Sequence, residues 1–246
     1  MPRFIRRIIQ KMYRSFRDRG ALSTFGRSVA APYFILREYK RARQEFDWKF
    51  GVDTDGSIEL RRLNIESPNK VYGANYGATS PNIFWQALAS LEINYQDFVF
   101  LDLGSGKGRV VLLASELPFK EIIGVEFSQE LNDIAQANVH RYRSKSQRCN
   151  QITLMCADFI DFPIPEVPVF FFMYYPCKAP AMQSLIQNIK KSVLNNPREI
   201  YILYVNPQLS NMIENANFVT TIAKTNDFAL YSNTTGMKTP QLAPND

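Results

Sequence analysis

A run of alternating glycines could bring the protein backbone close to a bound ligand. It has the pattern D-x-G-x-G-x-G over residues 102–108, directly after an apolar stretch and before a helical one. Glycine accepts backbone conformations that other residues avoid, and the N-terminus of the following helix offers unpaired N–H groups. Arg109 stands where the dinucleotide pattern G-x-G-x-x-G and the phosphate-loop pattern G-x-x-x-x-G-K both need glycine. The spacing therefore disfavours both phosphate-binding interpretations.

The elements that position this loop follow from the apolar patterning of the chain. Near-continuous apolar runs predict strands at 98–103, 121–125, 151–155, 167–174 and 200–205. Helical patterns lie between them, at 109–117, 128–143 and 178–195. This alternation predicts an α/β fold with a doubly wound, mostly parallel sheet, whose ligands bind at the carboxyl ends of its strands.

The segment before the first strand contains a loop and a helix. Ser80 is expected to cap a helix that accepts Pro81 in its first turn and extends to about Leu91. Residues 67–81 are rich in Gly, Asn and Pro and include two tyrosines, so we expect them to form a loop. This loop is either a functional lid or only a linker.

The glycine pattern, with acids after two later strands, resembles the class I S-adenosylmethionine-dependent methyltransferases. The resemblance implies a Rossmann-like α/β fold and S-adenosylmethionine as cofactor, whose cationic ammonium and sulfonium suit an acidic rim. It also implies that Glu126 accepts hydrogen bonds from the ribose hydroxyls and that Asp158, with an adjacent apolar residue, holds the adenine. The residues expected to bind the cofactor are Asp102, Gly104, Ser105, Gly106, Gly108, Glu126, Phe127, Asp158, Phe159, Tyr76 and Thr79.

A closer resemblance covers most of residues 46–210. Several segments of this region are similar to a poorly characterised bacterial group of class I methyltransferases with a basic N-terminal extension. The glycine motif is also distantly similar to lysine methyltransferases that act on histone cores and on the ATP synthase c subunit. The resemblance implies an enzyme whose favoured methyl acceptor is a protein lysine or another amine. Nucleic acid and small molecules remain as alternative acceptors, and a cofactor-binding module without transfer activity is the competing hypothesis.

The end of the fourth predicted strand should line the acceptor side. Many amino-group methyltransferases carry Asn or Asp before Pro there, whereas this chain has Tyr174 and Tyr175 before Pro176. Both tyrosines are candidate catalytic residues, because their rings and hydroxyls can orient a lysine amine, although both could also be partly core. Asn206, before Pro207 at the end of the fifth strand, is a second candidate for the acceptor wall or merely a strand stop.

Composition limits the other chemistry of the chain. The single histidine, His140, excludes zinc clusters and catalytic triads or dyads that are built on a second imidazole, and no metal is expected. The cysteines, Cys149, Cys156 and Cys177, fit neither a disulfide framework nor a zinc pattern. A reducing compartment is therefore expected, and the cytoplasm is the predicted location.

The N-terminal region carries the basic excess. Residues 1–50 hold 13 Lys and Arg against 4 Asp and Glu, and apolar residues recur at helical spacing up to about Gly20. This basic helical extension could bind an anionic membrane surface or a nucleic acid, or dock on the protein's own core. We expect residues 51–97 to form a cap or lid segment and residues 98–246 to form the methyltransferase core. No apolar run reaches the roughly 20 residues of a membrane-spanning helix.

Overall fold

The computed structural model describes residues 45–89 and 91–234. The chain divides into two compact units, residues 1–46 and 47–246, and the elements described here lie in the second unit. The amphipathic helix predicted near the N-terminus and the rest of the basic extension up to residue 44 lie outside the described residues.

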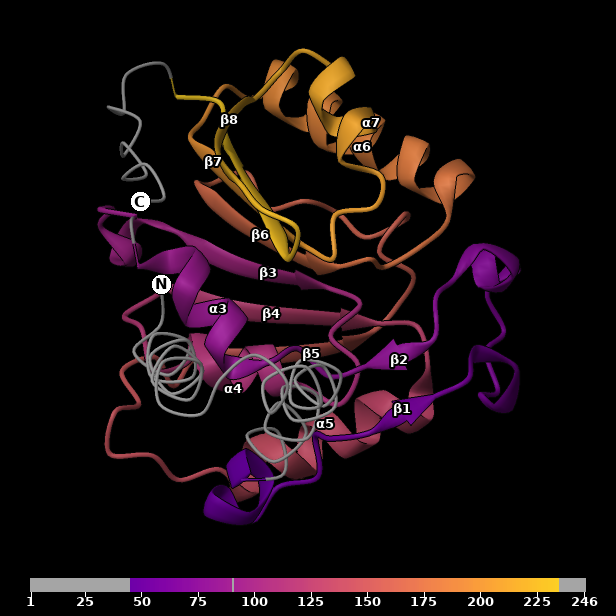
Figure 1. Ribbon diagram of the computed structural model, residues 1–246, viewed down its shortest axis with the longest axis vertical. Helices are drawn as coiled ribbons and strands as arrows, with labels where there is room; N and C mark the ends of the chain where they lie inside the picture. The colour runs from indigo at the N-terminus through magenta and orange to yellow at the C-terminus, as the bar shows by residue number, and fades with distance from the viewer. Residues whose placement is uncertain (1–44, 90, 235–246) are drawn as a thin grey trace, which may run out of the picture. The chain divides into compact units, whose positions relative to one another are not determined.

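A seven-stranded sheet forms the centre of this unit, in the order β5-β4-β3-β6-β7-β9-β8 (Figure 1). Its strands are β3 (Val99–Leu103), β4 (Glu121–Glu126), β5 (Ile152–Cys156), β6 (Val169–Tyr174), β7 (Ile200–Val205), β8 (Thr220–Lys224) and β9 (Phe228–Ser232). The first five of these strands pair in parallel, and β9 pairs antiparallel with both β7 and β8. The predicted α/β fold with a doubly wound, mostly parallel sheet is confirmed.

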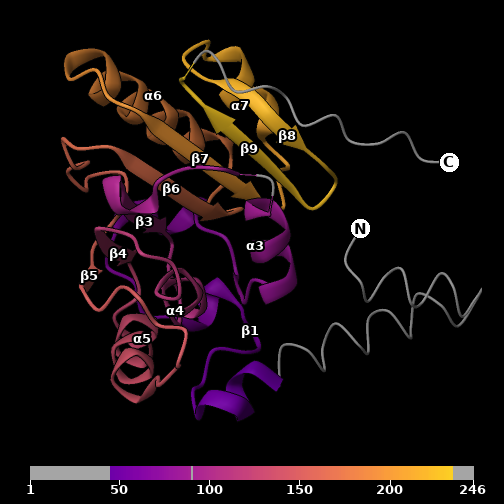
Figure 2. The same cartoon turned by 90° about the vertical axis from the view of Figure 1, so that its left-hand side faces the viewer.

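Helices cover both faces of the sheet (Figure 2). The helices are α3 (Pro81–Leu88), α4 (Arg109–Ala114), α5 (Gln129–Arg141), α6 (Ala179–Asn195) and α7 (Ser210–Asn215). Successive residues of a strand point to opposite faces, so Val99 and Leu101 of β3 pack in the core beneath α6. Phe100, between them, stacks with Phe170 and meets Phe84 of α3. None of the helices in the described part of the chain has the length and apolar character needed to cross a membrane.

The segment before β3 is more structured than the sequence predicts. The expected loop at 67–81 contains a 3-10 helix, η2 (Pro68–Tyr72), and a short strand, β2 (Tyr76–Gly77). This strand pairs antiparallel with β1 (Ser57–Ile58), and a second 3-10 helix, η1 (Leu60–Arg62), lies between β1 and η2. Strands of two residues leave no periodic apolar pattern, which is why the sequence predicts only a loop.

Ser80 does not cap α3 as predicted. The helix begins at Pro81, but the Ser80 hydroxyl makes no capping hydrogen bond and is buried without a partner among the described residues. Its backbone carbonyl accepts from Ile83 and Phe84 instead, at 3.1 and 3.2 Å. The helix ends at Leu88, three residues before the predicted end.

The β8–β9 hairpin also escapes prediction from the sequence. Residues 220–224 of β8 are mostly exposed and lack a continuous apolar run, whereas β9 is buried against β7. The hairpin extends the sheet beyond β7 and leaves the site edge unchanged.

Candidate functional site

The glycine loop joins β3 to α4 at the carboxyl edge of the parallel strands. Gly104, Gly106 and Gly108 have φ angles of 84, 54 and 82°, in the left-handed region that favours glycine. The ring of Tyr76 lies against Gly106, where an added Cβ would come within 2.3 Å of a ring carbon. Gly108 packs against Ala135 of α5, at 3.1 Å from an added Cβ. The left-handed backbone conformation favours glycine at all three positions. At Gly106 the close contact with the Tyr76 ring is a second reason for glycine.

Glu126 fixes the loop from the neighbouring strand. Its carboxylate accepts hydrogen bonds from the backbone N–H groups of Gly106 and Ser128, both at 2.9 Å. Burial raises the pKa of Glu126 to about 7, and these backbone hydrogen bonds act in the opposite direction. The side chain is therefore held in place but exchanges its proton near neutral pH.

Asp102 lies at the end of β3 and is almost fully buried, with 1% of its surface exposed. Burial, and then the charge of Glu126, raise the pKa of Asp102 well above its ordinary value. Its Oδ2 atom has no hydrogen-bond partner among the described residues. A buried oxygen without a partner is costly, so a ligand that brings a donor to this atom would stabilise the site.

A pocket beside the glycine loop brings together most of the residues predicted to bind a cofactor. Those that line it are Tyr76, Thr79, Asp102, Gly104, Ser105, Glu126, Phe127 and Phe159, together with both tyrosines predicted to be catalytic, Tyr174 and Tyr175. Gly106 lies behind Tyr76, and Gly108 lies at the start of α4 and packs on α5.

Asp158, unlike the other two predicted acids, does not line the pocket. Its carboxylate accepts hydrogen bonds from the Ser67 hydroxyl and from the Asn69 amide, the latter at 2.8 Å. The backbone N–H of Ile160 donates to its other oxygen at 2.9 Å. The expected three-acid rim is therefore a two-acid rim of Asp102 and Glu126, because Ser67 and Asn69, at the start of η2, bind the carboxylate of the third acid.

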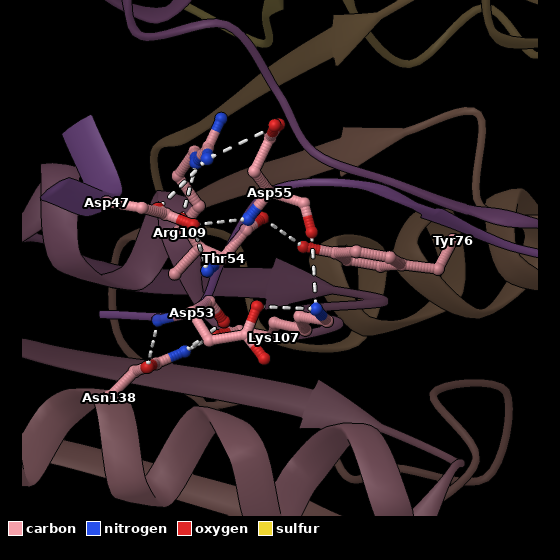
Figure 3. Close-up of polar contacts among 8 residues, drawn as sticks. All are labelled: Asp47, Asp53, Thr54, Asp55, Tyr76, Lys107, Arg109 and Asn138. Atoms are coloured by element: carbon pink, nitrogen blue, oxygen red, sulfur yellow. Dashed lines mark hydrogen bonds and ion pairs between the residues drawn. The ribbon is translucent and has the colours of Figure 1, made fainter. Parts of the chain in front are cut away.

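A segment that the sequence analysis did not assign to the site is fastened to the glycine loop (Figure 3). We call residues 47–55 the strap. The Arg109 guanidinium, with 2% of the side chain exposed, pairs with Asp47 at 3.1 Å and with Asp55 at 3.6 Å. Its Nε donates to the Thr54 hydroxyl at 2.6 Å. Arg109, which replaces the glycine of the phosphate-binding patterns, thus anchors the strap.

A second set of contacts joins the strap to the loop (Figure 3). Lys107 pairs with Asp53 at 2.7 Å. The side chain of Asn138 donates to the backbone carbonyls of Asp53 and Lys107, at 2.7 and 2.9 Å, and accepts from the Asp53 N–H at 2.8 Å. The Tyr76 hydroxyl donates to the carbonyl of Thr54 at 2.6 Å. The only sequence signal for this arrangement is the opposite charge of the two segments.

An open groove meets the pocket at Tyr174 and Tyr175. The residues that line it are Glu59, Leu60, Arg61, Lys70, Val71, Gly73, Ala74, Asn75, Tyr174, Tyr175, Lys178 and Asn206, and four of these, Ala74, Asn75 and the two tyrosines, also line the pocket. Tyr175 and Asn206 directly follow the paired strands β6 and β7 and have φ angles of 34 and 52°. Such strained conformations often mark functional sites. The groove and the pocket therefore adjoin each other at the residues that they share.

A comparison with protein families finds a match to part of the chain. Residues 59–161, less than half of the chain, match the family described as histone methylation protein DOT1. The matched region contains η1, η2, the glycine loop and Glu126, and it includes the strands β3, β4 and β5 of the sheet. The chain is a class I S-adenosylmethionine-dependent methyltransferase.

Several solved structures are similar to this methyltransferase in fold. The ribosomal protein L11 methylase of Lactobacillus delbrueckii subsp. bulgaricus is 16% identical with a TM-score of 0.43, over 62% of this chain and 75% of that one. An RNA methyltransferase from Salinibacter ruber is 16% identical with a TM-score of 0.41, over 68% and 97% of the two chains. The glycopeptide N-methyltransferase MtfA is 11% identical with a TM-score of 0.45, over 62% and 92%. No curated protein matches the chain.

The pocket of the methyltransferase suits its cofactor, S-adenosylmethionine, by charge. The cofactor carries a positively charged ammonium and a positively charged sulfonium, and the pocket offers the buried carboxyls of Asp102 and Glu126. An N–H of the ammonium would satisfy the Asp102 oxygen that has no partner among the described residues. When bound, the cofactor supplies the methyl group carried by its sulfonium.

Proposed function

We propose that the methyltransferase transfers the methyl group to the side-chain amine of a protein lysine or to a similar amine. The observation that carries this proposal is the position of Tyr174 and Tyr175, which line both the cofactor pocket and the open groove. Aromatic rings attract a cationic group and tolerate an aliphatic stem, which together make up a lysine side chain. The likeness of residues 59–161 to a family named for histone methylation supports a protein acceptor.

The cofactor is oriented in this proposal by the two rim acids and by the residues around them. Glu126 accepts hydrogen bonds from the ribose hydroxyls, while Asp102 receives the ammonium. Tyr76 and Thr79 close over the methionine part of the cofactor, since both line the pocket and Tyr76 is tied to Thr54 by its hydroxyl.

The adenine lies between apolar side chains in this proposal. Phe127 and Phe159 line the pocket beyond Glu126 and provide aromatic surface for the base. The carboxylate of Asp158 is hydrogen-bonded to Ser67 and Asn69. In this proposal Asp158 does not contact the adenine but helps to position the adjacent Phe159.

Methyl transfer requires the acceptor nitrogen to approach in line with the bond that breaks, and the protein contributes mainly by positioning. We assign this positioning to Tyr174 and Tyr175. The lysine ammonium must lose a proton to solvent before its lone pair can attack, and the nitrogen becomes positively charged again as it gains the methyl group. The Tyr175 hydroxyl hydrogen-bonds to this amine, and the rings exclude water from it during transfer. Asn206, directly beside Tyr175 at the end of β7, adds an amide oxygen on the same wall.

Transfer of a tritiated methyl group into a cell extract tests this proposal. We expect labelled material that protease degrades and ribonuclease does not, with mass spectrometry locating the added methyl group on a lysine. Tyr175→Ala should depress turnover strongly with near-normal cofactor affinity, and Tyr175→Phe separates the contribution of the hydroxyl from that of the ring. Tyr95→Phe, a half-buried tyrosine before the opposite end of β3, is the matched control. Label found only in nuclease-sensitive material would refute an amine acceptor on a protein.

A further inference from the structure

The walls of the open groove are fixed to each other by backbone hydrogen bonds. One wall is η2, and another is the turn that follows β6. The N–H of Lys178 donates to the carbonyl of Tyr72 at 2.7 Å, and Gly73 forms an antiparallel bridge with Cys177. The groove is therefore a constant feature of this edge of the sheet, and its chemistry can be derived from the side chains that line it.

The charged side chains of the groove are mainly basic. Arg61, Lys70 and Lys178 line it, against a single acid, Glu59, which pairs with Arg61. The ammonium of Lys70 donates to the carbonyl of Leu63 at 2.6 Å, and that of Lys178 donates to the carbonyl of Val71 at 3.0 Å. A carbonyl positions an ammonium but does not cancel its charge, and it leaves the other N–H donors of each lysine available.

Neither lysine forms a salt bridge within the described part of the chain. The groove therefore has two uncompensated positive charges on its walls and two tyrosines where it meets the cofactor pocket. Apolar surface is also exposed along η2, because Val71, which lines the groove, is 64% exposed and its neighbour Tyr72 is 38% exposed.

We propose that this groove binds the acceptor as a protein segment that carries an acidic residue close to the methylated amine. This inference rests on the proposed function. The tyrosines receive the amine-bearing side chain, and Lys70 and Lys178 attract the neighbouring carboxylate. The exposed surface of Val71 and Tyr72 provides apolar contact for the polypeptide.

A nucleic acid fits this groove less well than an acidic protein segment. Tight binding of a nucleic acid typically neutralises several phosphates along a backbone, with about six to ten contacts in strong complexes. Among the described residues, the groove offers two cations without an acidic partner, a number that matches one or two carboxylates.

Binding of three labelled peptides to the full-length protein, loaded with S-adenosylhomocysteine, tests the inference. Each peptide has one central lysine, flanked on both sides by Glu, by Gln or by Lys, and fluorescence anisotropy reports the dissociation constant. We expect the Glu-flanked peptide to bind about three- to tenfold more tightly than the Gln-flanked one, as two partly exposed charge pairs allow. The preference should shrink in high salt, because exposed charges are screened.

The double variant Lys70→Gln/Lys178→Gln should abolish this preference. Lys120→Gln/Lys191→Gln makes the same change in net charge at two exposed lysines outside the groove, so it should retain the preference. Equal binding of all three peptides, tighter binding of the Lys-flanked peptide, or loss of the preference in the control variant would overturn the inference.

Two further measurements separate the inference from the proposed function. The first measurement is the binding of a single-stranded RNA. If it binds more tightly than the Glu-flanked peptide and depends on Lys70 and Lys178, the ligand of the groove is a nucleic acid and the inference of an acidic protein segment is wrong. Transfer of labelled methyl groups to protein lysines without any charge preference would refute this inference alone. The binding assay could show a charge preference that depends on the two lysines while the transfer assay shows no methyl group on any amine. That result would refute the proposed acceptor but not the preference of the groove for an acidic segment.

Discussion

Replacing Arg109 by methionine should destabilise the methyltransferase by about 3 kcal/mol. Arg109 is 2% exposed and its partner Asp47 is 16% exposed, so their ion pair is largely removed from water. Removing one partner of a buried pair typically costs about 3 to 5 kcal/mol, because the other charge is left uncompensated. Asp47 keeps its hydrogen bonds from the N–H groups of Thr54 and Asp55, both at 2.7 Å, which places the expected cost at the lower end of that range.

Thermal unfolding followed by circular dichroism measures this cost. In a folded unit of about 200 residues, 1 kcal/mol shifts the melting temperature by about 2 to 4 °C, so Arg109→Met should melt about 6 to 12 °C lower. Arg62→Met is the matched control, because Arg62 is 72% exposed and its ion pair with Glu59 spans 3.7 Å. Adding Asp47→Asn to Arg109→Met should cost less than the sum of the single changes. A melting temperature within 2 °C of the wild-type value would refute the assignment of the strap's stability to this pair.

The two remaining predictions concern the ligands of the site. Burial raises the pKa of Glu126 to about 7, and the ionised carboxylate is the better acceptor for ribose hydroxyls, so affinity for S-adenosylhomocysteine should rise with pH, by up to about tenfold per unit below pH 7. Calorimetry between pH 5.5 and 8 should show this rise in the wild type and a shallower rise in Glu126→Gln, in which only Asp102 of the two rim acids retains a raised pKa, and a flat wild-type profile would contradict the prediction. Asn206→Ala and Asn217→Ala both place alanine at a left-handed position, with φ of 52 and 53° in the wild type, and should lower the melting temperature alike. Only Asn206→Ala should also reduce turnover, by about tenfold for one lost hydrogen bond to a charged amine, and equal turnover of the two variants would remove Asn206 from the acceptor wall.

The part of the site that the sequence predicted well is the part encoded locally. Gly104, Ser105 and Glu126 lie in or directly after buried strands, and the ends of parallel strands meet at one edge of a sheet. Their position in one pocket therefore follows from the strand pattern alone.

Asp158 shows where this reasoning ends. It follows β5 as predicted, but its partners Ser67 and Asn69 are 91 and 89 residues away in the sequence. No local pattern indicates that the start of η2 packs onto this strand end. The same holds for Arg109, whose substitution for glycine excluded two phosphate-binding motifs but gave no sign of its ion pair with Asp47, 62 residues earlier.

The long separation between the strap and the glycine loop also has a consequence for synthesis of the chain. Asp47 leaves the ribosome 62 residues before Arg109. At about 5 to 20 residues per second, several seconds pass before its partner is available. During this interval the acids of the strap lack their later partners Lys107 and Arg109, and the strap can take its place only after β3 and the start of α4 have emerged. The cofactor site is therefore completed by residues of the glycine loop, which are synthesised after the strap and then pair with it.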